Sequence, residues 1–375
     1  MNKHHRILVL GGHGNFGARI CKRLASDPGI ELMVAARRHD KARAFAQTLR
    51  GAAQAVMLDA QRPDLAQTLR KLQVHTLIHT AGPFQAQEYL VARACAEAGA
   101  HYIDLADGRE FVCAFPNALN SAFTAAGKLA VSGASTVPAL SSAVVDHLTI
   151  GWQAIDSIDV CIAPAQSAPR GQATIAAVLS YCGRPIPVWQ DGKWQSTIGW
   201  ASPTPVQFAH MKPRLGAVCD IPDLQLFPEH YSVRNSVRFR AALEVGLSQR
   251  AFAWLAYCVQ RGWIRHPERL ASVMHRFAPM FDRWGSALGG MVVSVDGLDE
   301  QGKAIHREWH ISADNDHGPE IPTMAAILLA RQLASGHPGG KVGAHTATSL
   351  LPLDAFQSEF KHWGMVTEIR QHAQD

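Results

Sequence analysis

A short apolar strand that runs directly into a glycine pattern constrains the fold of this chain most strongly. Residues 6–10 read as the strand, and the pattern G-x-G-x-x-G follows before a helical stretch at 18–25. In a dinucleotide-binding turn, these glycines allow the tight turn, the approach of a pyrophosphate and close helix packing. Because strand and helix flank the motif in the required order, we predict a dinucleotide site rather than a turn without a ligand. Its residues are Gly12, His13, Gly14, Asn15, Phe16 and Gly17.

The end of the next predicted strand, at residues 31–36, indicates which dinucleotide binds. NAD-binding units usually place Asp or Glu there, about 20 residues past the glycines, to hold the ribose 2′-hydroxyl. This chain has Arg37 and Arg38 instead. Arginine side chains donate charge-assisted hydrogen bonds to a 2′-phosphate, which a carboxylate would repel. NADP is therefore favoured over NAD, and the alternative for the two arginines is a solvated strand end.

Strands and helices alternate over the first third of the chain, which predicts a doubly wound parallel sheet. Further strands are predicted at 55–58, 74–79, 101–105 and 128–133, with helices at 65–72, 87–98 and 116–126. Such sheets bind ligands beyond the carboxyl ends of their strands. The additional candidate cofactor residues at those ends are Asp59, Thr80, Ala81, Gly82, Pro83, Phe84 and Ser135.

A change in composition near residue 150 predicts a second domain. Residues 1–150 contain no tryptophan, whereas eight of the nine lie between Trp152 and Trp309. Strands at 157–163, 291–295 and 307–311, hairpin turns at 192–193 and 297–302, and helices at 174–181 and within 249–281 indicate an α+β domain on a mixed or antiparallel sheet. A helix at 321–333 is expected to return to the first domain. The predicted NADP-binding domain is thus 1–134 plus about 320–375, and the predicted substrate and dimerisation domain is 135–319.

Composition excludes several classes of protein. The 375 residues are 47% hydrophobic and 18% charged, with a net charge of +5, and the scattered Lys and Arg side chains argue against nucleic acid. No apolar run reaches the roughly 18 residues of a membrane span, and no signal peptide is expected. The seven isolated cysteines fit a reducing cytoplasm. His306, Glu308 and His310 resemble metal ligands on paper, but a solvated strand face is the preferred interpretation, so no metal is expected.

Two charged residues beyond the strand at 101–105 are the catalytic candidates. Arg109 could clamp a substrate carboxylate with two parallel hydrogen bonds. Asp107 could accept or relay a proton. The alternative is an ion pair, Asp107–Arg109 or Arg109–Glu110, that only shapes the loop.

Candidate substrate residues lie in the second domain. Arg170 and Thr174 stand at the start of a predicted helix, whose N-terminus could hold a substrate anion. A structural cap would explain Thr174 equally well. His317 lies in a Gly-Pro loop, from which it could reach a ligand as an acid.

Several segments resemble the saccharopine dehydrogenase-like oxidoreductases of the reductase type, which have an N-terminal NADP domain. They are residues 11–17, 79–84, 102–111, 133–141, 171–174 and 317–322. The resemblance implies a Rossmann-type domain, an inserted α/β domain that often dimerises, and hydride transfer. It leaves the substrate open, because family members act on amino-acid imines, polyamine precursors and lipid-like ketones.

The functional hypothesis is an NADP-dependent oxidoreductase that moves a hydride to or from a C=N or C=O carbon of a small amino-acid-like substrate. A homodimer is expected. The alternative is a non-catalytic NADP sensor that binds a partner protein. A short-chain dehydrogenase is disfavoured because none of the five tyrosines has a lysine four positions later.

Overall fold

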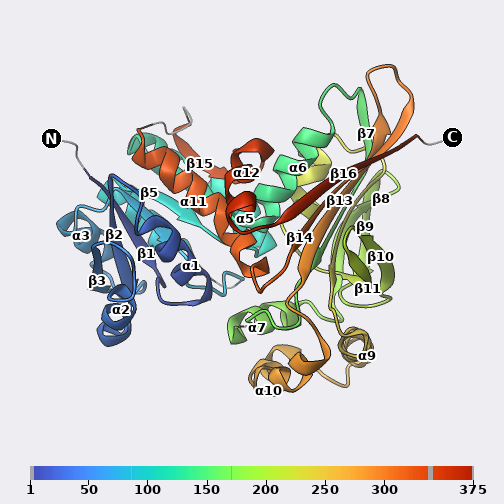
Figure 1. Cartoon of the computed structure of the whole chain (residues 1–375), viewed down its shortest axis with the longest axis horizontal. Coiled ribbons are helices and arrows are strands. Elements are labelled where there is room, and N and C mark those ends of the chain that lie inside the picture. The colour runs from blue at the N-terminus through green and yellow to red at the C-terminus, as the bar shows by residue number, and fades with distance from the viewer. Residues whose placement is uncertain (1–3, 86, 170, 337–340, 374–375) are drawn as a thin grey trace. The chain divides into compact units, whose positions relative to one another are not determined.

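The computed structural model describes residues 4–85, 87–169, 171–336 and 341–373. The chain divides into two units, of which the first comprises 1–139 and 320–347 and the second comprises 140–319 and 348–375 (Figure 1). The first unit is built on a parallel sheet and the second on a mixed sheet, which confirms the predicted α/β class.

The sheet of the first unit has seven strands within the described residues, in the order β15-β6-β5-β4-β1-β2-β3, and every pair is parallel. The strands are β1 (His5–Leu10), β2 (Ile30–Ala36), β3 (Ala53–Met57), β4 (Thr76–His79), β5 (His101–Asp104), β6 (Leu129–Ser132) and β15 (Gly343–Thr346). Ile7, Leu8 and Val9 are fully buried, as expected for a central strand of a sheet covered on both faces. The strand order reverses between β1 and β4, and ligands bind at such a switch point.

The helices of the first unit are α1 (Asn15–Leu24), α2 (His39–Ala46), α3 (Leu65–Lys71), α4 (Leu90–Ala98), α5 (Arg109–Ala125) and α11 (Ile321–Ala334). The predicted start of α5 at residue 116 is wrong, because Pro116 lies inside the helix. A helix tolerates an interior proline at the cost of one backbone hydrogen bond, here to the carbonyl of Val112. Arg109 and Glu110 consequently belong to the first turn of α5 rather than to a loop.

A segment distant in sequence completes the first unit. Helix α11 packs on α1 through ion pairs of Arg19 with Glu320 and of Arg331 with Asp27, the latter at 2.7 Å. Strand β15 then pairs in parallel with β6 and extends the sheet, with Gly343 opposite Leu129. Strand β15 was not predicted from the sequence.

The mixed sheet of the second unit has nine strands in the described part of the chain, in the order β10-β11-β12-β7-β13-β14-β16, with β8 pairing with β12 and β9 pairing with β8. The strands are β7 (Ala154–Ala163), β8 (Pro185–Gln190), β9 (Lys193–Ile198), β10 (Thr204–Phe208), β11 (Met211–Val218), β12 (Ser236–Ala242), β13 (Gly289–Leu298), β14 (Ala304–Ala313) and β16 (Val366–Ala373). Strands β7 and β12 pair in parallel, whereas β13 and β14 are antiparallel.

The helices of the second unit are α6 (Ser141–Leu148), α7 (Gln172–Ser180), α8 (Asp223–His230), α9 (Gly246–Gln260), α10 (Ala271–Phe277) and α12 (Leu353–His362). The stretch predicted as helical at 249–281 is interrupted. Gly262, with φ of 75°, follows the end of α9, and a 3-10 turn (Pro267–Leu270) precedes α10. Residues 348–375, which were predicted to belong to the first domain, add α12 and β16 to the second unit. None of the described helices has the length and apolar character to cross a membrane.

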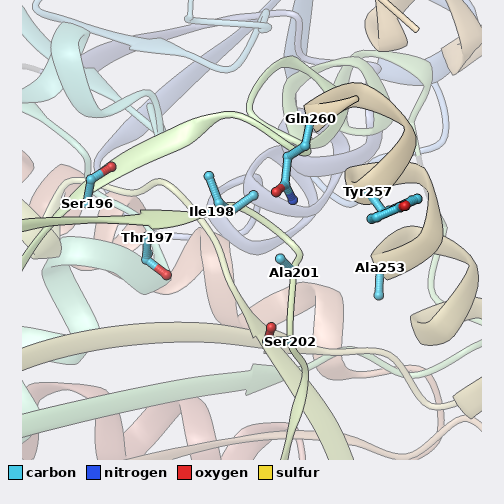
Figure 2. A pocket seen from close by; sticks show the side chains of 8 residues that line it. All are labelled: Ser196, Thr197, Ile198, Ala201, Ser202, Ala253, Tyr257 and Gln260. Carbon is cyan, nitrogen blue, oxygen red and sulfur yellow. The ribbon is translucent and has the colours of Figure 1, made fainter. Parts of the chain in front are cut away.

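The β8–β9 hairpin turns at Asp191 and Gly192, whose φ angles of 53° and 67° are those of a type I′ turn. A hairpin was predicted here with its turn at 192–193, and the turn lies one residue earlier. Strand β9 and the turn that follows it form one wall of a pocket, and α9 forms the other (Figure 2).

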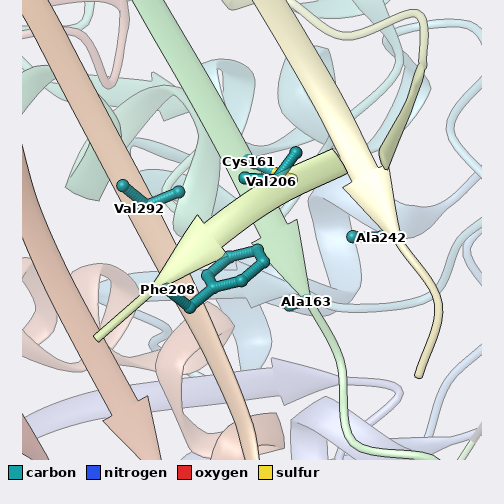
Figure 3. Close-up of a cluster of buried hydrophobic side chains, with 6 residues drawn as sticks. All are labelled: Cys161, Ala163, Val206, Phe208, Ala242 and Val292. Carbon is teal, nitrogen blue, oxygen red and sulfur yellow. The ribbon is translucent and has the colours of Figure 1, made fainter. Parts of the chain in front are cut away.

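An apolar cluster marks one part of the core of the second unit. Figure 3 shows β10 lying across neighbouring strands of the sheet, with Val206 and Phe208 close to Cys161 and Val292. All four side chains are buried. Strand β10 thus covers part of one sheet face.

Candidate cofactor-binding site

In the turn between β1 and α1, the backbone of Gly17 packs so closely against Gly11 that only glycine fits there. A Cβ atom on Gly17 would overlap the carbonyl oxygen of Gly11 and lie 2.7 Å from Thr80 Oγ1. Gly11 itself has φ of 82°, a conformation that favours glycine. Gly14 is exposed, and its N–H donates to the Gly11 carbonyl at 2.8 Å. The start of α1 is therefore lined by bare backbone at the end of a buried strand, which is the setting of an anion site.

Thr80, the residue after β4, braces this turn. Its hydroxyl donates to the Leu10 carbonyl at 2.9 Å, and its backbone N–H donates to the same oxygen at 3.0 Å. A Cβ on Gly11 would lie 2.9 Å from Thr80 Oγ1. The Thr80 side chain is thus occupied in holding the glycine turn, and a structural role accounts for it.

Arg37 and Arg38 follow β2 and are both exposed. Among the described residues, neither guanidinium has a hydrogen-bond or ion-pair partner, so their donors stay available to a ligand. Asp59, beyond β3, is half-buried and accepts a hydrogen bond from the backbone N–H of Gln61 at 3.1 Å. Its carboxylate is therefore turned back toward its own loop.

The loop after β4 is held in place by Gln87. The Nε2 atom of this side chain donates to the carbonyls of Ala81 and Pro83, both at 2.8 Å. Phe84 is only 5% exposed and packs against His79 and Phe111, with ring centroids 5.1 and 5.4 Å apart. Phe84 therefore belongs to the core, unlike the exposed Gly82 and Pro83.

Asp104, the last residue of β5, joins two loops of this edge. It is fully buried, and its Oδ1 accepts hydrogen bonds from Ala106 N–H (2.9 Å), Ser132 Oγ (3.0 Å) and Gly133 N–H (2.8 Å). Burial raises the pKa of Asp104 to about 6, although the hydrogen bonds oppose this shift. The carboxyl group fixes the loop after β5 to the loop after β6, which leads to Ser135.

His79, the last residue of β4, forms a second buried polar contact. Its Nδ1 lies 3.1 Å from the hydroxyl of Tyr102. Burial lowers the pKa of His79 to about 4 and raises the pKa of Tyr102, so both groups are neutral at neutral pH. His79, Asp104 and Ser132 each end a strand. That shared position is the sequence signal by which His79 and Ser132, which were not predicted as site residues, could have been found.

The catalytic candidates Asp107 and Arg109 lie between the end of β5 and the first turn of α5. Asp107 is exposed, and its Oδ1 accepts a hydrogen bond from Gln85 Nε2 at 3.1 Å. Arg109 is the first residue of α5, with Gly108 as its N-cap. The two side chains therefore stand on either side of a helix start.

A family model of the saccharopine dehydrogenase NADP binding domain matches residues 7–136. These residues belong to that domain family. The match covers the glycine turn, both arginines and the Asp104 network, and it confirms the family predicted from the sequence. A comparison with curated protein sequences gave no match.

Solved structures share the fold of this chain. The saccharopine dehydrogenase (L-Glu forming) of Saccharomyces cerevisiae is 12% identical, with a TM-score of 0.69, and the match covers 98% of this chain and 100% of that chain. An engineered D-amino acid dehydrogenase bound to NADP+ is 16% identical, with a TM-score of 0.50, over 95% and 99%. An amine dehydrogenase from Mycobacterium smegmatis is 9% identical, with a TM-score of 0.51, over 93% and 97%.

The substrate candidates lie outside the saccharopine dehydrogenase NADP binding domain. Thr174 is exposed on α7, which begins after the N-cap Gly171, and Arg170 lies outside the described residues. The Nδ1 of His317 lies 2.9 Å from the carbonyl of Trp363, and the two rings pack at 5.0 Å. Because a carbonyl accepts, Nδ1 carries a hydrogen in this contact.

The loop that leads to α7 is tied to the loop that carries His317. Ser167 Oγ donates to the carboxylate of Asp316, the neighbour of His317. Gln166 N–H and Ser286 Oγ donate to the carboxylate of Glu244, at 2.8 and 2.6 Å. These bonds bring the start of α7 and the His317 loop to the same side of the second unit.

The histidines of β14 contact carboxylates. His306 Nδ1 lies 2.7 Å from Asp296, and His310 Nε2 lies 3.1 Å from Glu308. In the described part of the chain, no three His, Cys, Asp or Glu side chains are arranged to hold a metal ion. The prediction of a solvated face is wrong for His310, which is only 2% exposed and accepts a hydrogen bond from the Ala209 N–H at 3.1 Å.

Proposed function

We propose that this protein is an NADP-dependent oxidoreductase that moves a hydride to or from a C=N or C=O carbon of a small amino-acid-like substrate. The observation that carries the proposal is the turn at Gly17, where the bare backbone at the start of α1 follows a buried strand. The match of residues 7–136 to an NADP binding domain supports it. The similar folds include dehydrogenases of amino acids and amines, which agrees with the proposed substrate class.

The residues of the first unit fit a dinucleotide. The N-terminus of α1 would hold the diphosphate, with Gly14 leaving space for it, and Arg37 and Arg38 would bind the 2′-phosphate of NADP. The small residues Ala81 and Gly82 would border the nicotinamide half. The nicotinamide supplies or accepts the hydride, and the protein orients both reactants and excludes water.

Five side chains are proposed to contact the substrate or to transfer its proton. Arg109 would pair with a substrate carboxylate, and its place in the first turn of α5 adds the positive end of the helix dipole. Asp107, oriented by Gln85, or His317, oriented by the Trp363 carbonyl, would transfer the proton. Arg170 and Thr174 remain proposed contacts at the start of α7.

The test combines binding with turnover. Calorimetry should show that NADPH binds more tightly than NADH, and a panel of 2-oxo acids with ammonia or amino acids should drive NADPH oxidation. Gly14→Asp, which places a carboxylate beside the proposed diphosphate, should abolish binding without lowering the melting temperature. Failure of the wild-type protein to bind either nucleotide would overturn the proposal. Binding without turnover on the whole panel would favour the sensor alternative, and sedimentation tests the proposed homodimer.

A further inference from the structure

Strand β9 ends the sheet of the second unit with an open edge. Within the described residues it pairs only with β8, and Ser196 lies opposite Pro187, which has no N–H to donate. The Gly199 N–H donates to Arg184 on the β8 side at 3.0 Å. Because backbone groups alternate in direction along a strand, the N–H and carbonyl of Ser196 point to the open edge. Such an edge is a template for another strand.

A pocket of about 480 Å³ lies along this edge. Ser196, Thr197 and Ile198 of β9 form one wall, and Tyr257 and Gln260 of α9 stand opposite, as Figure 2 shows. Ala201, Ser202 and Ala253 complete the lining. The lining carries hydroxyl, amide and phenol groups and no charge, so it can satisfy the hydrogen bonds of a neutral polar chain such as a peptide backbone.

Helix α9 presents an aromatic and basic stripe beside the pocket. Leu247, Arg250, Trp254, Tyr257 and Arg261 recur at spacings of three and four residues and therefore share one face. The exposed fractions of Leu247, Trp254 and Tyr257 are 60%, 65% and 43%, although such side chains usually gain stability by burial. The Arg261 guanidinium lies 5.0 Å from the centroid of the Tyr257 ring. Tyr257 belongs to both the stripe and the pocket.

The positive charge beside the groove between β9 and α9 indicates which kind of partner would bind there. Residues 246–265 contain three arginines and no Asp or Glu. A symmetric contact between two copies through this face would oppose these arginines to each other, and like charges disfavour it. A lipid surface would not use the open backbone groups of β9 or the hydroxyl-lined pocket. An extended acidic peptide can pair with the arginines, bond to the open backbone groups of β9 and fill the hydroxyl-lined pocket at the same time.

We propose that the groove between β9 and α9 binds an extended, acidic segment of a partner protein. The segment pairs with Ser196 as an added strand, places an apolar side chain beside Tyr257 and sets carboxylates against Arg250 and Arg261. Main-chain pairing then supplies affinity, and the pocket and the arginines supply specificity. The inference rests on the second unit alone and holds whether or not the proposed oxidoreductase activity does.

The test uses end-blocked, fluorescein-labelled hexapeptides that alternate valine or phenylalanine with either glutamate or lysine. Fluorescence anisotropy with the full-length protein should show binding of glutamate peptides, and about tenfold weaker binding of lysine peptides. Ser196→Pro removes the outward N–H while sparing the hydrogen bonds to β8, and edge strands accept proline. It should weaken binding about tenfold, and Ser196→Ala, its matched control, keeps the backbone N–H and loses only the hydroxyl, so it should weaken binding much less.

A second measurement uses the wild-type protein and changes the peptide instead. Glutamate peptides with alternate N-methylated backbone nitrogens should lose binding, and the parent peptide should slow hydrogen exchange at the Ser196 amide. Absence of binding by every glutamate peptide, or equal binding by Ser196→Pro, overturns the proposal. So does a wild-type dimer that Ser196→Pro dissociates, which would show a second copy in the groove. Binding of anionic vesicles that Trp254→Ala abolishes and Ser196→Pro retains would assign the surface to lipid instead.

Discussion

Asp104 accepts a hydrogen bond of 2.8 Å from the backbone N–H of Gly133, and this contact links the ends of two neighbouring strands. The strand register brings β5 and β6 side by side, with Ile103 opposite Val131. One buried carboxyl group thereby positions two loops that border the proposed cofactor site.

Replacing Asp104 by alanine should destabilise the first unit. The Gly133 and Ala106 N–H groups would lose their acceptor while staying buried, which costs on the order of 2–4 kcal/mol in the free energy of unfolding. Urea unfolding measures this loss, and NADPH titration should show weaker binding. The control is Asp107→Ala, an exposed carboxylate on the same loop, which should leave stability unchanged. Equal stabilities of the two variants would contradict the role of Asp104.

The glycines of the first turn should differ in their tolerance of a methyl group. Gly17→Ala forces a Cβ into the Gly11 carbonyl, so we expect a loss of stability of about 3 kcal/mol or more. Gly14→Ala meets only the Gly11 carbonyl, at 3.1 Å, and should fold but bind NADPH more weakly. Gly246→Ala, with no neighbour within 4 Å, is the control. Thermal melts and nucleotide titrations separate the effects, and a stable Gly17→Ala protein would refute the packing argument.

Charge reversal beyond β2 should change nucleotide preference. The double substitution Arg37→Asp with Arg38→Ala should weaken NADPH binding by about a hundredfold or more, because each of the two lost charge-assisted hydrogen bonds contributes roughly 1.5–3 kcal/mol. NADH binding should change far less. Arg62→Ala removes another exposed arginine of the same unit, one that is paired with Asp64, and serves as control. An equal loss of affinity for both nucleotides would argue against 2′-phosphate recognition.

Acid should destabilise the first unit through its histidines. Burial and neighbouring His75 and Lys128 lower the pKa values of His5 and His101 from 6.5 to about 4. The unfolded chain therefore binds more protons between these values, so stability falls as the pH drops from 6.5 to 4. His101→Asn keeps an acceptor for the Leu129 N–H, which His101 binds at 3.0 Å, but cannot be protonated.

The pH dependence of this variant should therefore be flatter. Urea unfolding at pH 8, 6.5, 5 and 4 should show parallel behaviour above pH 6.5 and a smaller loss for His101→Asn below it. The raised pKa of Asp104 acts in the opposite direction, giving stability that is lost as the pH rises through about 6. Because both proteins contain Asp104, its effect cancels in the difference. Identical curves for the two proteins would contradict the assignment to His101.

Local patterns were sufficient to predict most of the first sheet. Strands β1 and β2 are apolar runs bounded by turn residues, and the glycine spacing predicted the turn between β1 and α1. Strand β15 was missed because it is four residues long and has only two buried positions. The start of α5 was misplaced because a proline commonly stands at the first turn of a helix, whereas Pro116 lies in its interior.

The site was harder to predict than the fold. The Asp104 network joins residues 28 and 29 positions apart, and only the pairing of parallel strands brings them together. Phe84 was predicted as a cofactor residue from its place after β4, yet its apolar ring turns into the core. The order of residues along the chain predicts which loops meet, but the direction of each side chain depends on packing from other segments.

Strand β15 also decides how the first unit can be separated from the rest. A fragment that stops at residue 139 would lack α11 and β15. Strand β6 would then have an unpaired edge, and the face of α1 that α11 covers would be exposed to solvent. We expect such a fragment to precipitate. A chain in which a short linker joins residues 1–139 directly to residues 320–347 should instead be soluble. The first unit is compact in space, but two separate segments of the gene encode it.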